Sequence, residues 1–76
     1  MNKVEVFSSD TCKYCVELKD YLKENNVEYI EYNISKDLEA KRELIRMGYM
    51  SIPVLIIDGE HVLGFDLNRI ESLLQK

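Results

Sequence analysis

The apolar residues of this chain change their spacing several times within 76 residues, and this constrains the fold more than any other feature. Residues 2–7 alternate between apolar and polar side chains, as a half-buried strand does. Helical spacing follows from about residue 12 to residue 25, and residues 27–33 are again rich in strand-forming side chains. Three residues share the buried stripe of that first helix: Cys15, Leu18 and Leu22.

The second half of the chain begins with another predicted helix. Ser35 is predicted to cap it, with Asp37 and Glu39 in the first turn, where the helix dipole favours acidic side chains. Gly48 suits the position just after its last turn. Three residues form its expected buried stripe: Ala40, Leu44 and Met47.

Two strands and a helix complete the pattern. An apolar strand over 53–57 is joined to a short strand over 60–63 by Asp-Gly at 58–59, which is a hairpin signal. Gly64 breaks the second strand, and Asp66 is predicted to cap the last helix. Three residues share the expected buried face of that helix: Leu67, Ile70 and Leu74.

The resulting element order is β-α-β-α-β-β-α. A helix between the first two strands implies a right-handed crossover and parallel pairing, whereas the last two strands form an antiparallel hairpin. We therefore expect one α/β domain over residues 1–76, with a four-stranded mixed sheet flanked by three helices.

Composition excludes several classes of protein. The formal charge is −4 and no block of lysine or arginine is present, so nucleic acid is not an expected partner. The longest apolar run, within 51–58, is far too short to span a bilayer, so no membrane association is expected. Residues 1–7 lack the apolar core of a signal peptide, which predicts a reducing cytoplasm, where disulfides are mostly transient and catalytic.

Cys12 and Cys15 are the chain's two cysteines, and they stand three residues apart. As a structural disulfide the pair would close a very short loop, which removes little entropy from the unfolded chain. As a zinc site it lacks ligands, because such sites usually have four and the sequence adds a single, distant His61. We expect His61 to face solvent and no metal to be bound. A C-x-x-C pair after the first strand of a βαβ pattern is typical of a redox dithiol.

The position of the dithiol at a helix start predicts different roles for its two thiols. Cys12 would lie near unpaired backbone N–H groups and the positive end of the helix dipole, and both favour the thiolate. Lys13 adds a positive charge in the same direction, whereas Asp10 opposes it. Cys15 lies one turn deeper, on the apolar stripe. Cys12 is therefore predicted to attack a substrate disulfide, and Cys15 to resolve the mixed disulfide.

Three motifs in this sequence resemble those of the glutaredoxin family, whose fold is thioredoxin-like. The family's C-P-Y-C dithiol reads C-K-Y-C at 12–15, its T-V-P reads Ser51-Ile52-Pro53, and its glycine-rich turn reads L-G-F-D at 63–66. The resemblance covers essentially the whole chain and matches the expected element order.

The resemblance also implies how substrate is held. It implies a cis peptide bond before Pro53, beside the dithiol, and pairing of the Ile52 backbone with the peptide-like part of a thiol substrate. It implies that the backbone N–H groups of Phe65 and Asp66 hold a substrate carboxylate, while Tyr14 lines the glutathione groove. From sequence alone, Pro53 could also be an ordinary strand-start proline, and Asp66 only a helix cap. The predicted substrate-binding residues are Lys13, Tyr14, Ile52, Pro53, Phe65 and Asp66.

Two departures from the family pattern leave the electron donor open. Lys13 replaces the motif proline, and Ser9 stands where glutaredoxins often carry a cation for the glycine carboxylate of glutathione. Lys41 or Arg42 could supply that cation. Residues 63–65 also resemble a related group of redoxins that are recharged by thioredoxin reductase and serve ribonucleotide reductase.

The sequence therefore predicts a monomeric glutaredoxin-type thiol–disulfide oxidoreductase. It would reduce protein or glutathione mixed disulfides, with glutathione as co-substrate and no tightly bound cofactor. Two alternatives stay open: a redoxin recharged by thioredoxin reductase and serving ribonucleotide reductase, and a module that bridges an iron–sulfur cluster between two subunits.

Overall fold

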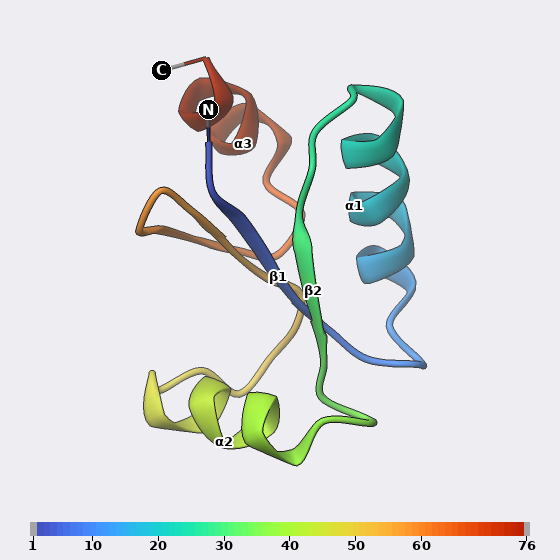
Figure 1. Cartoon of the computed structure of the whole chain (residues 1–76), viewed down its shortest axis with the longest axis vertical. Helices are drawn as coiled ribbons and strands as arrows, with labels where there is room; N and C mark the ends of the chain where they lie inside the picture. Colours follow the sequence, from blue (N-terminus) through green and yellow to red (C-terminus); the bar gives the residue numbers. More distant parts are fainter. Residues whose placement is uncertain (1, 76) are drawn as a thin grey trace.

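The computed structural model describes residues 2–75, and its elements follow the predicted β-α-β-α-β-β-α order (Figure 1). The strands are β1 (Val4–Ser8), β2 (Ile30–Asn33), β3 (Val54–Ile57) and β4 (Glu60–Leu63). The helices are α1 (Lys13–Glu24), α2 (Leu38–Arg46) and α3 (Leu67–Leu74). Within residues 2–75, no helix is long and apolar enough to cross a membrane.

The four strands form one mixed sheet in the order β2-β1-β3-β4. Strand β1 is parallel to β2 and antiparallel to β3, which is itself antiparallel to β4, as expected. Phe7 near the end of β1 pairs with Tyr32 of β2 and with Val54, the first residue of β3. Val54 also pairs with Leu63, the last residue of β4. The chain segments that leave β1, β2 and β4 and the one that enters β3 therefore meet at one end of the sheet.

Two apolar clusters hold helices against opposite faces of this sheet. On one face, Val6 and Leu55 pack in a cluster with residues of α1 and α3. On the other face, Phe7 and Val54 pack with Ala40 and other residues of α2. Because neighbouring strand residues point to opposite faces, the alternation in residues 4–7 and 54–57 supplies both clusters.

The predicted stripe of α1 is confirmed in full. Cys15, Leu18 and Leu22 have no exposed surface, while the other residues of the helix are partly or fully exposed. Burial of a leucine side chain contributes about 2 kcal/mol, so this stripe fixes which side of the helix faces the sheet. The orientation of the dithiol relative to the sheet follows from it.

The start of α2 differs from the prediction that Ser35 is its cap. Residues 34–36 form a turn, and the N-cap is Asp37, whose Oδ1 accepts a hydrogen bond from the Ala40 N–H at 3.2 Å. The hydroxyl of Ser35 instead accepts a hydrogen bond from the Asp10 N–H at 3.1 Å. The Ser35 hydroxyl, which local sequence predicts as the helix cap, is therefore used in a contact with a distant part of the chain.

The second strand is shorter than the predicted range 27–33. Asn26 has a positive φ of 57°, and the Val27 N–H donates to the Leu22 carbonyl at 2.9 Å, so residues 26 and 27 close α1 and do not extend β2. The apolar side chains of Val27 and Tyr29 still pack against the core from this connection. Their strand-like composition reflects burial rather than sheet pairing.

The buried face of α3 also differs from the predicted set. Ile70 is buried as expected, but its buried companion is Leu73, whereas Leu74 is only partly buried. Leu67 is 40% exposed because it is the first residue of the helix, directly after the cap Asp66. After Ile70, the next buried residue of this short helix is therefore three positions later, at Leu73, and not four positions later, at Leu74.

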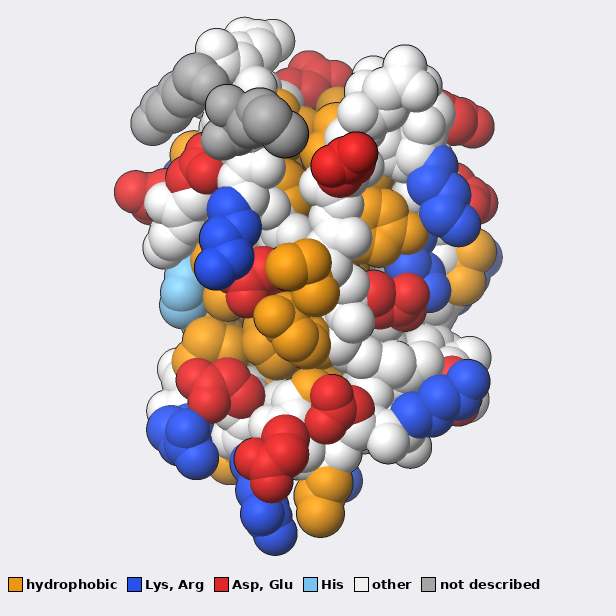
Figure 2. All heavy atoms as spheres, viewed as in Figure 1, with side chains coloured by type: hydrophobic (Ala, Val, Ile, Leu, Met, Phe, Trp, Pro, Cys, Tyr) orange, Lys and Arg blue, Asp and Glu red, His pale blue; other side chains and the backbone are white. Residues whose placement is uncertain are grey.

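Charged side chains of both signs are interspersed over the face of the molecule that carries α1 and β2 (Figure 2). Several charged side chains of the protein form exposed ion pairs, among them Arg46–Glu43 at 2.8 Å within α2. Each such pair contributes little to stability. This face carries no block of a single charge, which agrees with the composition.

Candidate active site

The dithiol lies at the N-terminal end of α1, where Cys12 is the N-cap. Cys12 has an extended backbone (φ −92°, ψ 109°), and its Sγ accepts a hydrogen bond from the Cys15 N–H at 3.1 Å. The two cysteines are joined by a disulfide, with their Cα atoms 5.2 Å apart. The sulfur of Cys12 therefore occupies the place of a capping oxygen, where the amides of the first turn have no partner within the helix.

The two sulfurs differ in their access to solvent. Cys15 is fully buried on the apolar stripe of α1, whereas Cys12 is partly exposed at the helix end. A substrate disulfide can therefore reach Cys12, and Cys15 is shielded from it. This is the asymmetry that the spacing of the stripe predicts.

Asp10 is bound by the last residue of β2 and by the turn that follows this strand. Its Oδ1 accepts a hydrogen bond from Asn33 Nδ2 at 2.8 Å and lies 3.9 Å from Lys36 Nζ. Its backbone N–H donates to Ser35 Oγ at 3.1 Å. Sequence reasoning left open how far Asp10 would oppose a Cys12 thiolate. These contacts engage its charge and fix the loop that leads into Cys12.

A buried serine at the end of β1, Ser8, was not singled out by sequence reasoning. Ser8 ends β1 with no exposed surface, and its hydroxyl donates to Glu31 Oε2 at 2.6 Å. Lys19 of α1 lies 2.8 Å from the same oxygen. The hydrogen bonds from Lys19 and Ser8 lower the pKa of Glu31. In the sequence, the burial of Ser8 is indicated only by its position, two residues after Val6 in the alternation that begins at Val4.

The Ile52–Pro53 peptide bond is cis, as the family resemblance implies. Pro53 is buried directly before β3, and its carbonyl accepts a hydrogen bond from the Gly64 N–H at 2.8 Å. Within residues 2–75, the backbone N–H and C=O of Ile52 have no hydrogen-bond partner. Because β3 starts where β1 ends, this free backbone lies at the same end of the sheet as the loop that leads to Cys12.

The turn after β4 lies at this end too. Gly64 has a positive φ of 76°, and Asp66 caps α3 by accepting from the Arg69 N–H at 3.3 Å. Neither the Phe65 nor the Asp66 backbone N–H has a hydrogen-bond partner in the described part of the chain. Unpartnered amides at a helix start are suited to an anion.

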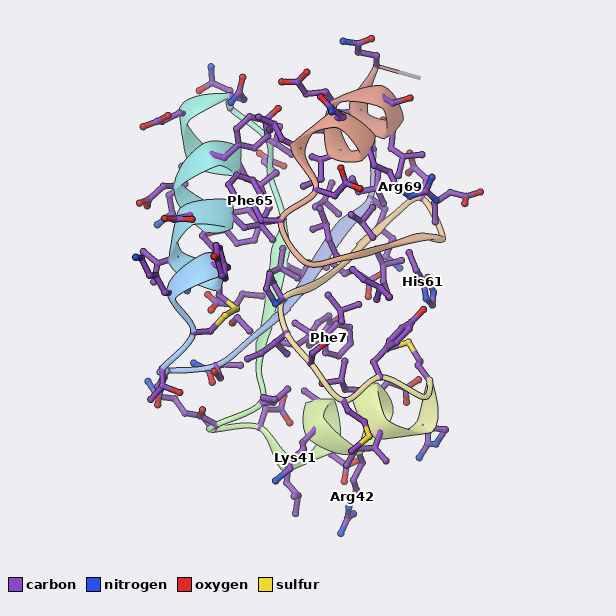
Figure 3. The ribbon with its side chains drawn as sticks, turned by 180° about the vertical axis from the view of Figure 1, so that it is seen from behind. Phe7, Lys41, Arg42, His61, Phe65 and Arg69 are labelled. Carbon is purple, nitrogen blue, oxygen red and sulfur yellow. A yellow bond between two sulfur atoms is a disulfide. The ribbon has the colours of Figure 1, made fainter. Side chains whose placement is uncertain are left out.

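Phe65 is partly buried. It packs against Tyr21 of α1 with the ring centroids 6.0 Å apart, and Figure 3 shows it directed toward that helix. Burial, and then the charge of Glu71, raise the pKa of the Tyr21 hydroxyl. Phe65 thus ties the turn after β4 to the dithiol helix.

Lys13 and Tyr14 are exposed on the first turn of α1. The Tyr14 side chain is 62% exposed, and Lys13 has no carboxylate within ion-pair distance in the described part of the chain. Both are therefore open to a ligand that approaches Cys12. Their part in substrate binding, like that of the other predicted residues, stays a prediction.

His61 lies away from the dithiol on the exposed strand β4. Its Nδ1 is hydrogen-bonded to the Tyr49 hydroxyl at 2.5 Å, and the two rings meet edge to face. Among residues 2–75, no group of three or more histidine, cysteine or acidic side chains is arranged to hold a metal ion. His61 has a surface packing role in this arrangement.

The glutaredoxin family model matches residues 4–62 of this chain, which include the dithiol and the cis proline. The chain belongs to the glutaredoxin family. It is accordingly a thiol–disulfide oxidoreductase, with Cys12 and Cys15 as its redox-active disulfide.

Bacterial relatives of this glutaredoxin match it over most of their length. An uncharacterised glutaredoxin-like 8.6 kDa protein of the rubredoxin operon of Clostridium pasteurianum is 31% identical, covering 96% of this chain and 99% of that one. Glutaredoxin 3 of Escherichia coli is 33% identical over 87% of this chain and 81% of its own. The glutaredoxin-like protein NrdH of Lactococcus lactis is 30% identical over 92% of this chain and 97% of its own.

A solved structure supports the same fold. The crystal structure of the thioredoxin-like protein BC3987 superposes with a TM-score of 0.86 and 39% sequence identity, covering 93% of this chain and 99% of that one. The fold of this glutaredoxin is therefore thioredoxin-like, as the sequence predicted.

Proposed function

We propose that this glutaredoxin reduces protein and glutathione mixed disulfides with Cys12 as nucleophile and Cys15 as resolving thiol. The thiolate of Cys12 attacks one sulfur of a substrate disulfide, forms a mixed disulfide, and releases the other sulfur as a thiolate. The thiolate of Cys15 then attacks Cys12 Sγ, closes the disulfide seen in the structure, and releases the second substrate thiolate. The hydrogen bond from the Cys15 N–H to Cys12 Sγ carries this proposal, because the same amide would stabilise the negative sulfur of Cys12 in the reduced protein.

Substrate would be held across the end of the sheet where the dithiol loop, Ile52 and the turn after β4 meet. The free backbone of Ile52 would pair with the peptide-like part of the substrate. The unpartnered N–H groups of Phe65 and Asp66 would bind a carboxylate, as helix starts commonly do. Lys13 and Tyr14 would flank the bound thiol from the first turn of α1. Of these residues, only Cys12 and Cys15 change chemically.

Glutathione is the electron donor that we propose. One glutathione thiolate attacks Cys12 and releases Cys15 as a thiolate; a second glutathione attacks the glutathione sulfur of the mixed disulfide, which regenerates Cys12 and yields oxidised glutathione. The activity would operate in the reducing cytoplasm, where glutathione keeps thiols reduced. Membership of the glutaredoxin family supports this donor.

Recharging by a thioredoxin reductase, with ribonucleotide reductase as client, is a second candidate. Two observations favour it: the NrdH relative matches 97% of its own length, and Ser9 carries no cation before the motif. Turnover of a disulfide substrate, measured separately with glutathione plus its reductase and with a thioredoxin reductase system, distinguishes the two. Turnover in the glutathione system alone supports our proposal, and turnover in the thioredoxin reductase system alone would replace glutathione as donor.

The cluster-bridging alternative is tested by anaerobic reconstitution with iron and sulfide in the presence of glutathione. A visible absorption band together with a dimer would support it. A colourless monomer would leave the dithiol activity as the function.

A further inference from the structure

An open groove lies along α2, and its lining residues fall between the dithiol and the cis proline in sequence. Five residues line most of it: Ile34, Lys41, Ile45, Tyr49 and Met50. We propose that this α2 groove docks an extended segment of a substrate protein, one that carries a carboxylate beside an apolar side chain. The inference rests on the proposed dithiol exchange and names the class of protein substrate that it selects.

Two apolar residues of the groove lining are exposed. Met50 is 100% exposed and Ile45 is 61% exposed, so folding leaves both side chains in water. A single exposed apolar residue is common, whereas two of them at one concavity favour an interaction site. Methionine suits such a site because its flexible side chain adapts to different partners.

Lys41 has no ion-pair partner in the described part of the chain. The other cations of α2 are paired: Arg42 lies 3.3 Å from Glu39, and Arg46 lies 2.8 Å from Glu43. Among residues 2–75, no carboxylate lies within ion-pair distance of Lys41. Figure 3 shows both Lys41 and Arg42 extending from α2 away from the sheet. Lys41 is therefore the free cation at the wall of an apolar groove.

The net charge of the chain makes this cation selective. At a formal charge of −4, the molecule as a whole repels acidic ligands. An acidic segment is consequently favoured where Lys41 meets it and disfavoured over most of the remaining surface. Complementary charge placed in this way fixes the register of a partner more than it raises affinity.

The groove lies close in sequence to the substrate-binding backbone. Met50 precedes Pro53 by three residues, so their Cα atoms are at most about 11 Å apart. A substrate whose cysteine reaches Cys12 while its backbone pairs with Ile52 would therefore place neighbouring residues in the groove. The acidic and apolar side chains are expected roughly three to five residues from the reacting cysteine, at about 3.3 Å per extended residue.

The test is a single-turnover reaction of the chemically reduced protein, which does not depend on the electron donor. The probes are synthetic peptides in which one cysteine is disulfide-bonded to thionitrobenzoate. Attack of Cys12 on the peptide sulfur releases the coloured aromatic thiolate and leaves the peptide bound to Cys12. Each peptide carries a Glu-Leu, Lys-Leu or Glu-Ser pair three to five residues before or after the cysteine. Glutathione bonded to thionitrobenzoate is the control probe, because it has no segment that could reach the groove.

Lys41→Glu and Arg42→Glu form a matched pair, because they are adjacent, exposed and change the charge equally. We expect the wild type to react at least about threefold faster with the Glu-Leu peptide than with the Lys-Leu peptide at one of the placements. Lys41→Glu should reverse that preference, and Arg42→Glu should keep it. Ile45→Ser should remove the advantage of Glu-Leu over Glu-Ser. Ile45→Ser should leave the rate with the glutathione probe unchanged, and Lys41→Glu should slow that probe less than it slows the Glu-Leu peptide.

Three results would overturn the inference. The two charge variants could shift all peptides equally, which would indicate a general field effect. Lys41→Glu could slow the glutathione probe as much as the peptides, which would assign Lys41 to glutathione. Sedimentation of the wild type could show a dimer that Met50→Ser dissociates, which would assign the groove to a second copy. If the wild type does not react with any probe, the proposed function itself fails, and that outcome is distinct from a reaction without peptide preference.

Discussion

The backbone N–H of Cys15 donates a hydrogen bond to Cys12 Sγ over 3.1 Å, so Cys12 is at once half of the dithiol and the N-cap of α1. The donor of this bond belongs to the residue that resolves the mixed disulfide in the proposed mechanism. Formation of the first helical turn therefore aligns both sulfurs and provides the amide that stabilises the negative one. The fold and the chemistry depend on the same few backbone atoms.

The first prediction separates the two cysteines. Cys12→Ser should reduce turnover to the uncatalysed background while changing the free energy of unfolding by less than about 1 kcal/mol, because serine is a good N-cap. Cys15→Ser should accumulate a Cys12 mixed disulfide, visible by mass spectrometry, or retain only the reduction of glutathione mixed disulfides. Full activity in the Cys12 variant would show that another group is the nucleophile.

A second prediction concerns Glu31 and pH. Its pKa is lowered in the folded state by hydrogen bonds from Lys19 and Ser8, so its contribution to stability is complete above the ordinary carboxyl pKa. That contribution is lost as the pH falls through the lowered value. Because the carboxylate is partly exposed, we expect a contribution of at most about 1 kcal/mol. Urea unfolding of wild type and Glu31→Gln between pH 7 and about pH 3 measures it; a difference that does not change with pH would contradict the assignment.

The core gives a third prediction with an internal control. Leu55 of β3 is fully buried, whereas Leu63 of β4 is 57% exposed. Leu55→Ala should lower the free energy of unfolding by about 2–5 kcal/mol, which is a large part of the stability of so small a domain. Leu63→Ala should lower it by less than about 1 kcal/mol. Similar losses in the two variants, measured by urea denaturation, would mean that the β4 face is covered in solution.

The cap of α2 gives a fourth prediction. Asp37→Ala removes the acceptor for the Ala40 N–H and should destabilise the protein by about 1 kcal/mol, whereas Asp37→Asn should restore most of that loss. Thermal unfolding followed by circular dichroism measures both. If Ser35→Ala, and not Asp37→Ala, frayed the helix, the cap predicted from sequence would be the right one.

The order of the elements could be predicted from the sequence because each one is set by local periodicity. Cys15, Leu18 and Leu22 recur at helical spacing, and all three are buried, so that pattern was enough to orient α1. The motif at 51–53 and the cis bond before Pro53 were also predicted, through family resemblance rather than periodicity.

The remaining features depend on contacts between segments distant in sequence. Ser35 and Asp37 are both good caps, and the choice between them follows from Asp10, which lies 25 residues before Ser35 and takes its hydroxyl. The link from Ser8 to Glu31 spans 23 residues and arises from the pairing of β1 with β2. The free charge of Lys41 likewise becomes visible only when the partners of Arg42 and Arg46 are known.

The most direct test of the central claim is the pH dependence of Cys12 alkylation in the reduced protein. The rate with iodoacetamide should follow a single ionisation with a pKa clearly below that of a free cysteine, about 8.5. Cys15→Ser keeps the backbone N–H that binds Cys12 Sγ, so it should preserve the low value and identify the thiol that titrates. A Cys12 pKa at or above the ordinary value would contradict the account, because the helix start would then give the nucleophile no advantage.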